Sequence, residues 1–241
     1  GNTQSTDFYL LGETYFNTNS GRQDMWVMKL DPRSADESTR VPYSTYVGGL
    51  GIETVRAMAV DPVTGLVYLT GSTTTATQFP EVTSFQRTNQ GGTDAFLAVL
   101  DPTKTLFASV VHLAFVGGTG TDEGRGIAVF NGKAYITGQT ASSNFPVKNA
   151  IQGTLVAGAE IFVSEFDPTK TGDDALISST FITGGANDYA RSIAVDAQGK
   201  VYIAGITYSP GLPTTANAFQ GDYLDGGEGF LLKLDLEAQT V

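Results

Sequence analysis

The chain has 241 residues, of which 41% are hydrophobic and 16% are charged, and its formal net charge is −11. This composition is too apolar for disorder, and the negative charge excludes nucleic acid as an expected partner. The absence of cysteine excludes disulfides, thiolate metal ligands and thiol nucleophiles. The longest apolar run, at about 110–116, is far too short to insert across a membrane.

Short strand patterns follow one another from the start of the chain. The first three are FYLLGET around Gly12, DMWVMKLDP ending at Pro32 and VPYSTYVGG ending at Gly49. Each is rich in β-branched and aromatic residues and is bounded by residues typical of turns. Because the chain also contains 29 glycines, a turn-rich all-β protein is predicted.

From Gly48 onward, four strand patterns recur in a fixed order, so the chain is built from repeats. Strand A begins with a glycine pair and an arginine, as in GGLGIETVRAMAVD, and strand B is VYLTGST. Strand C is DAFLAVLDP, and strand D is VVHLAFVGG. The strand B glycines, Gly71, Gly138 and Gly205, lie 67 residues apart. Four-stranded antiparallel units of this size are typical of a β-propeller.

Strand C is apolar on both faces, because Phe96 and Ala98 alternate with Leu97 and Val99. Such a strand is expected to lie between two neighbouring sheets. Trp26 takes the place of Phe96 in the first repeat and is expected in the core. Strand A carries small alanines instead, which suit a crowded innermost strand beside a central channel.

A further signature lies between strands B and C, in TQFPEVTSFQ, SNFPVKNAIQ and PGLPTTANAFQ. Proline fixes φ and donates no backbone hydrogen bond. Pro80, Pro146 and Pro213 therefore predict an ordered loop outside the strand ladder. The first repeat lacks this insertion.

Together, the glycine pair, the arginine-led IAVD strand, the VYxxG strand, the FP...FQ loop and the closing FxxKLDP strand resemble the bacterial β-propeller repeat family called the SBBP repeat. The resemblance extends from about Asp7 to Leu236. It implies a β-propeller in a secreted or cell-surface bacterial protein, and it supplies no shared catalytic residues. One propeller or propeller segment is expected over 1–241, with blades at 7–50, 51–117, 118–184 and 185–241.

The order of the strand patterns predicts an incomplete ring. The first blade reads B–C–D and the last reads A–B–C, so an inner strand is missing from one and an outer strand from the other. A missing strand leaves backbone groups unpaired and invites association. We expect further blades from the same longer chain or from a neighbouring chain.

One arginine opens each strand A, with acidic residues a few positions earlier. These residues could form a charged ring at a channel mouth that binds an ion or a polar ligand. Alternatively, each arginine pairs with a carboxylate or with turn carbonyls of the neighbouring repeat. The channel-mouth candidates are Arg56, Arg125, Arg191, Asp122 and Asp188.

Metal and catalytic chemistry has little support in the sequence, and no cofactor is expected. Carboxylates in glycine-rich loops could still bind a single Ca²⁺ ion; these are found in the run 117–125 and at Asp222, Asp225 and Glu228. His112, the only histidine, lies within an apolar strand, which favours a structural role over catalysis.

We expect a non-enzymatic scaffold that binds protein or glycan, because the repeat architecture comes with no catalytic constellation. Two alternatives stay open. One is a hydrolase or lyase that acts on polysaccharide with carboxylates at the channel mouth. The other is a subunit of a surface layer or filament whose missing strands come from neighbouring chains.

Overall fold

The computed structural model describes residues 1–8, 10, 18–76, 85–86, 88–156 and 158–241. Nearly all of the regular structure is strand, with one short helix, α1 (Glu37–Arg40), and 3₁₀ turns at 107–109 and 172–174. The strands are β1 (Asn2–Thr3), β2 (Asp24–Lys29), β3 (Tyr43–Val47), β4 (Glu53–Val60), β5 (Val67–Thr73), β6 (Asp94–Leu100), β7 (Val110–Val116), β8 (Asp122–Phe130), β9 (Lys133–Thr140), β10 (Glu160–Phe166), β11 (Leu176–Ile182), β12 (Asp188–Val195), β13 (Val201–Thr207) and β14 (Glu228–Leu234).

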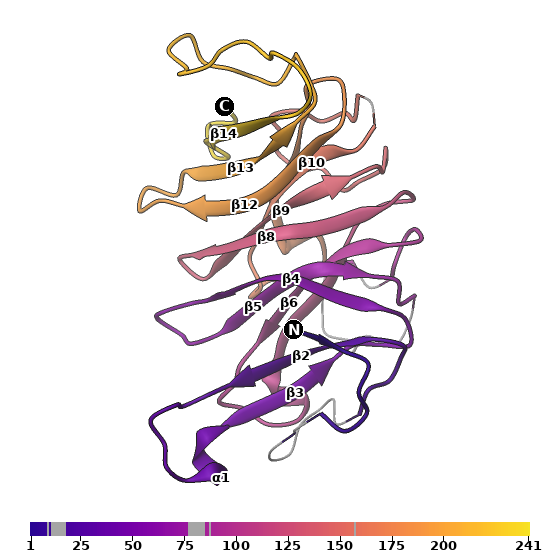
Figure 1. Cartoon of the computed structure of the whole chain (residues 1–241), viewed down its shortest axis with the longest axis vertical. Coiled ribbons are helices and arrows are strands. Elements are labelled where there is room, and N and C mark those ends of the chain that lie inside the picture. The colour runs from indigo at the N-terminus through magenta and orange to yellow at the C-terminus, as the bar shows by residue number, and fades with distance from the viewer. Residues whose placement is uncertain (9, 11–17, 77–84, 87, 157) are drawn as a thin grey trace.

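The strands form four antiparallel sheets that follow one another along the long axis of the molecule (Figure 1). Two sheets have four strands in chain order, β4 to β7 and β8 to β11, which correspond to the patterns A to D. The first and last sheets have three described strands each, β1 to β3 and β12 to β14. The predicted all-β architecture of repeated sheets is therefore confirmed, and the described sheets form an open row.

The first sheet differs in its opening strand. The strand predicted around Gly12 falls largely on residues 9 and 11–17 and lies outside the described residues. Among the described residues, β1 pairs antiparallel with β2, with Asn2 opposite Met25. In the same sheet β2 pairs with β3, so the C and D patterns of this repeat form neighbouring strands.

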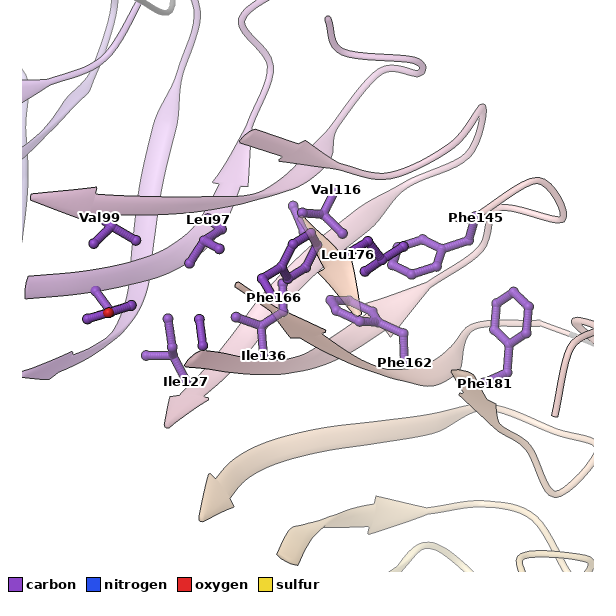
Figure 2. Close-up of a cluster of buried hydrophobic side chains, with 13 residues drawn as sticks. Leu97, Val99, Val116, Ile127, Ile136, Phe145, Phe162, Phe166, Leu176 and Phe181 are labelled. Atoms are coloured by element: carbon purple, nitrogen blue, oxygen red, sulfur yellow. The ribbon is translucent and has the colours of Figure 1, made fainter. Parts of the chain in front are cut away.

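The core lies between successive sheets, as the apolar pattern of strand C predicts. Every residue of β6 is buried. Phe96 packs in one cluster with Met25 of the first sheet, whereas Leu97 and Val99 pack in another with Ile136 of the third sheet (Figure 2). β10 is buried along its whole length in the same way. These strands therefore join their neighbours through both faces.

Trp26 is only half-buried, so its expected core position is wrong in degree. Side chains alternate between the two faces of a strand. Met25 and Val27 take the face of β2 that packs toward β6, and Trp26 points to the other face. Its ring packs there on Phe8, with 4.9 Å between the ring centroids.

β4, β8 and β12 each carry a β-bulge at the same position. In β4 the register passes from Val55 opposite Gly71 to Ala57 opposite Thr70, which leaves Arg56 as the extra residue. The bulge brings the Thr54 carbonyl so close to β5 that a Cβ at position 71 would lie 1.9 Å from its oxygen. The strand B glycine is therefore required by the bulge opposite it.

The loop between strands B and C makes more of the sheet than the sequence suggested. In the third sheet, Lys148 and Gln152 form antiparallel bridges to the outer edge of β11, at Ser179 and Phe181. The Ser179 hydroxyl also donates to the carbonyl of Pro146 at 2.7 Å. The prediction that this loop lies wholly outside the ladder is wrong at these two bridges.

No helix in the described part of the chain is long and apolar enough to cross a membrane.

Candidate functional site

The three predicted arginines occupy one equivalent position in three neighbouring edge strands. Arg56, Arg125 and Arg191 are the extra residues at the bulges of β4, β8 and β12. β8 lies against both β4 and β12, so the three bulges form a row along the molecule (Figure 1). We call these three residues the arginine row. A bulge re-aims the side chain of its extra residue away from the regular strand faces.

The members of the arginine row differ in their partners. Arg125 is half-buried and forms an ion pair with Glu123, two residues before it on β8. Arg56 and Arg191 are exposed, and neither takes part in an ion pair with the described residues. The alternative that each arginine pairs with a carboxylate of the next repeat is not seen in the described structure. Two guanidinium groups therefore remain available to a ligand.

The acidic candidates lie elsewhere, in buried pairs between successive sheets. One member of each pair begins strand C of a sheet, and the other begins strand A of the next sheet. All six are no more than 1% exposed. We call them the junction pairs; they are Asp24 with Glu53, Asp94 with Asp122, and Glu160 with Asp188.

The junction pairs meet over the glycine pair that links the sheets. A Cβ placed on Gly117 would lie 2.7 Å from Oδ1 of Asp94 and 2.8 Å from Oδ2 of Asp122. The Gly118 N–H donates to Oδ2 of Asp122 at 2.8 Å, and the Ser142 hydroxyl donates to the same oxygen at 2.7 Å. The glycine pair therefore gives two carboxyl groups room to approach and supplies one of them with a donor.

The other two junctions repeat this pattern. Glu53 accepts hydrogen bonds from the Gly49 N–H at 3.0 Å and from the Thr73 hydroxyl at 2.9 Å. Asp188 accepts from the Gly184 N–H at 3.1 Å and from the Thr207 hydroxyl at 2.6 Å. Such regular bonding satisfies the first residue of each strand A and fixes one sheet on the next.

The strand C members are less fully bonded. Oδ2 of Asp24 accepts the Ser20 N–H at 2.8 Å, and Oδ2 of Asp94 accepts the Gln90 N–H at 2.8 Å. The Oδ1 atoms of both residues are buried without a hydrogen-bond partner. An unbonded buried carboxylate oxygen is costly, so protonation is favoured. A carboxyl proton there can be shared with the second acid of the pair.

The pKa values agree with this geometry. Burial raises the pKa of Asp24, Glu53 and Asp122 above the ordinary carboxyl range. Burial, together with the neighbouring charge of Asp122, raises the pKa of Asp94 to about 6. Removal from water and a nearby like charge both disfavour the charged form. These carboxyls are therefore structural groups near neutrality rather than exposed anions.

Asp122 and Asp188 are thus separated in role from the arginine row. They are enclosed between sheets, and none of the ion pairs among the described residues joins them to an arginine. No three potential metal-binding side chains cluster anywhere in the described part of the chain. His112 is buried on β7 opposite Val99, and burial lowers its pKa to about 4.

Sequence reasoning singled out the second acid of the junction pairs but missed the first. The signal was present, because all four copies of strand C begin with Asp or Glu: Asp24, Asp94, Glu160 and Glu228. A single sequence does not show that this residue meets the start of strand A in the next repeat. The fourth copy, Glu228, is half-exposed and has no second acid beside it among the described residues.

Comparisons with known proteins give the following. No protein-family model matches the sequence, and no curated protein matches it. Among solved structures, the chain is similar to two mutants of the apocarotenoid oxygenase of Synechocystis, at 11% and 12% identity and TM-scores of 0.37 and 0.38. The match covers 90% of this chain and 42% of each oxygenase chain, so this chain spans less than half the length of those neighbours.

Proposed function

We propose that the four sheets are blades of a β-propeller that serves as a non-enzymatic binding scaffold of a secreted or cell-surface bacterial protein. The propeller and its location rest on the repeat pattern and on the resemblance to the SBBP repeat. The ligand would be a protein or glycan that carries isolated acidic groups. The arginine row is the surface that contacts those groups.

The observation that carries the proposal is the exposure of two members of the row without a protein partner. Packing explains a recurring residue when it is buried or bonded, as in the junction pairs. Arg56 and Arg191 are neither buried nor ion-paired among the described residues. A guanidinium group can bind a carboxylate through two parallel hydrogen bonds. An exposed, recurring arginine is therefore better explained by a ligand than by the fold.

The net charge narrows the ligand class. The chain carries 25 acidic and 14 basic residues, so a polyanion would be repelled over most of the surface. A glycan with one terminal carboxylate, or a protein segment with a single acid, avoids most of that repulsion. We expect binding to weaken with rising salt, because the contacts are exposed.

The test is a glycan array that contains matched neutral and acidic glycans, read with the whole chain and with its Arg56→Gln, Arg125→Gln, Arg191→Gln triple variant. Acidic glycans should be retained by the wild-type chain and lost by the triple variant. Arg33→Gln, which changes an exposed arginine in a distant turn, is the matched control and should bind like the wild type.

Retention by a folded triple variant would contradict the role of the arginine row. Cleavage of a bound glycan, abolished by substituting a carboxylate, would instead support the polysaccharide hydrolase or lyase. Circular dichroism of each variant establishes that the sheets are intact before binding is compared.

A further inference from the structure

The second and third sheets hold their strand D from both sides. β7 pairs with β6 through one edge, and β11 pairs with β10 in the same way. On the other edge, a glutamine of the B–C loop makes a backbone contact with each strand. The Phe115 N–H donates to the Gln86 carbonyl at 3.1 Å, and the Phe181 N–H donates to the Gln152 carbonyl at 3.0 Å.

The side chain of the same glutamine closes the end of the slot. Oε1 of Gln86 accepts the Gly117 N–H at 3.3 Å, and Oε1 of Gln152 accepts the Thr183 N–H at 2.8 Å. Each glutamine therefore acts as a clamp with two acceptors, one on the backbone and one on the side chain. This role explains why the loop signature ends in glutamine in all three copies.

The fourth sheet has the clamp and the receiving edge without a strand between them. β14 pairs with β13 and with no other described strand. A cavity of about 660 Å³ lies between β14 and the loop 209–223, and Gln220 is part of its lining. Phe230 and Leu232 of β14 line it as well. The cavity therefore lies where the other two sheets hold strand D.

The clamp is already oriented in the open sheet. Nε2 of Gln220 donates to Oε2 of Glu228 at 2.9 Å, so the amide nitrogen is directed at the first acid of strand C. In the second sheet, Nε2 of Gln86 lies 3.5 Å from Oδ2 of Asp94, the equivalent acid. With its nitrogen held in this way, Gln220 presents its oxygen to an incoming N–H.

The filled slots also define what the occupant must contain. An aromatic residue of strand D lies directly opposite the strand C phenylalanine, Phe115 opposite Phe96 and Phe181 opposite Phe162. A β-branched residue follows, at Val116 and Ile182. Cross-strand aromatic pairs of this kind stabilise a sheet. Phe230 occupies the same place in the open sheet and lacks this partner.

We propose that the edge of β14 is a docking site for an extended segment of a partner polypeptide, which adds to the sheet as an antiparallel fourth strand. The segment places an aromatic residue opposite Phe230 and a β-branched residue after it, and its backbone N–H groups bond to Gln220. Strand addition of this type takes affinity from main-chain hydrogen bonds and specificity from alternate side-chain pockets. The site is distinct from the arginine row and does not depend on it.

The experiment uses the whole chain and a labelled synthetic peptide with the sequence of residues 176–185, which contains β11. We expect saturable binding by fluorescence anisotropy. The Phe181→Pro peptide, which lacks both the aromatic ring and the N–H, should not bind. Gln220→Ala in the protein should weaken binding about fivefold, as the loss of one hydrogen bond does. Gln198→Ala, in an exposed turn, is the matched control and should leave binding unchanged.

Three results would overturn the proposal. The first is the absence of saturable binding by the peptide, and the second is equal binding by the Phe181→Pro peptide or by the Gln220→Ala protein. The third is a dimer of the chain alone that the peptide dissociates, because the occupant would then be a second copy. Hydrogen exchange of β14 gives an independent readout, since its amides should become protected only when the peptide is bound.

Discussion

The carboxyl group of Asp94 combines two unfavourable conditions for a charge. It is fully buried, and Asp122 accompanies it across the sheet junction. Its Oδ1 atom lacks a hydrogen-bond partner, which a proton on the carboxyl would supply. Because the pKa is about 6 in the folded chain and near 3.9 in an unfolded one, the folded state binds the proton more tightly.

The sign of the resulting pH dependence is determined by this raised pKa. Between about pH 4 and pH 6 the folded chain holds a proton at Asp94 that the unfolded chain releases, so stability falls as pH rises through this window. The difference in pKa corresponds to about 3 kcal/mol. His112 acts in the opposite direction, because its pKa is lowered to about 4 and the folded state resists its protonation.

Asp94→Asn separates these two effects. The amide mimics the neutral acid, so at pH 7.5 the variant should be more stable than the wild type by about 1 to 3 kcal/mol. The difference should vanish near pH 4, where Asp94 is itself protonated. Urea unfolding at several pH values provides the measurement. A variant that is less stable than the wild type at pH 7.5 would show that the ionised carboxylate is required.

At the level of residues, the sequence predicted half of each junction. Asp122 and Asp188 were named because they precede an arginine in the same strand, and local order in the sequence is visible. Their partners Asp94 and Glu160 start a strand of the preceding repeat. The meeting of the two acids depends on how one sheet packs on the next, which a single sequence does not record.

At the level of elements, the bulge in strand A and the glycine in strand B form one unit. In the third sheet, the bulge at Arg125 brings the carbonyl of Glu123 toward β9. A Cβ on Gly138 would lie 1.9 Å from that oxygen and 2.9 Å from the Phe162 ring. The arginine row is therefore positioned by the same backbone feature that requires the glycine.

Gly138→Ala should destabilise the chain by about 3 kcal/mol or more, because the clash is with backbone that cannot move without breaking the pairing of β8 and β9. Gly153→Ala is the control, since a Cβ there meets nothing within 4 Å. Its effect should stay within about 1 kcal/mol. Thermal unfolding of both variants tests the coupling, which would be wrong if the two changes were equally tolerated.

The strand patterns predicted the elements well where apolar alternation was strong. β6 and β10 are buried on both faces as their sequences require. The bulges and the bridges from the B–C loop to β11 were not predicted, because both depend on pairing between segments rather than on the composition of one segment. The repeated Arg, Gly and Gln positions were visible, but the contact that each one makes was not.

At the level of the whole molecule, each sheet packs against the sheets beside it. Stability in such an array is close to a sum of sheet terms and nearest-neighbour junction terms. The second and third sheets are covered on both faces by described neighbours, and their central strands β6 and β10 are fully buried. β14 lies at the end of the row, where Leu231 is 73% exposed although the equivalent Leu97 and Val163 are fully buried.

Native-state hydrogen exchange should therefore show a gradient along the row. Amides of β6 and β10 should exchange through the largest opening free energies, and those of β14 should exchange at least about tenfold faster, because local opening there breaks only one junction. Exchange is measured at low denaturant with the chain held dilute, so that association does not cover the open edge. Equal protection of β6, β10 and β14 would mean that the four sheets unfold as a single unit, and the nearest-neighbour description would then fail for this chain.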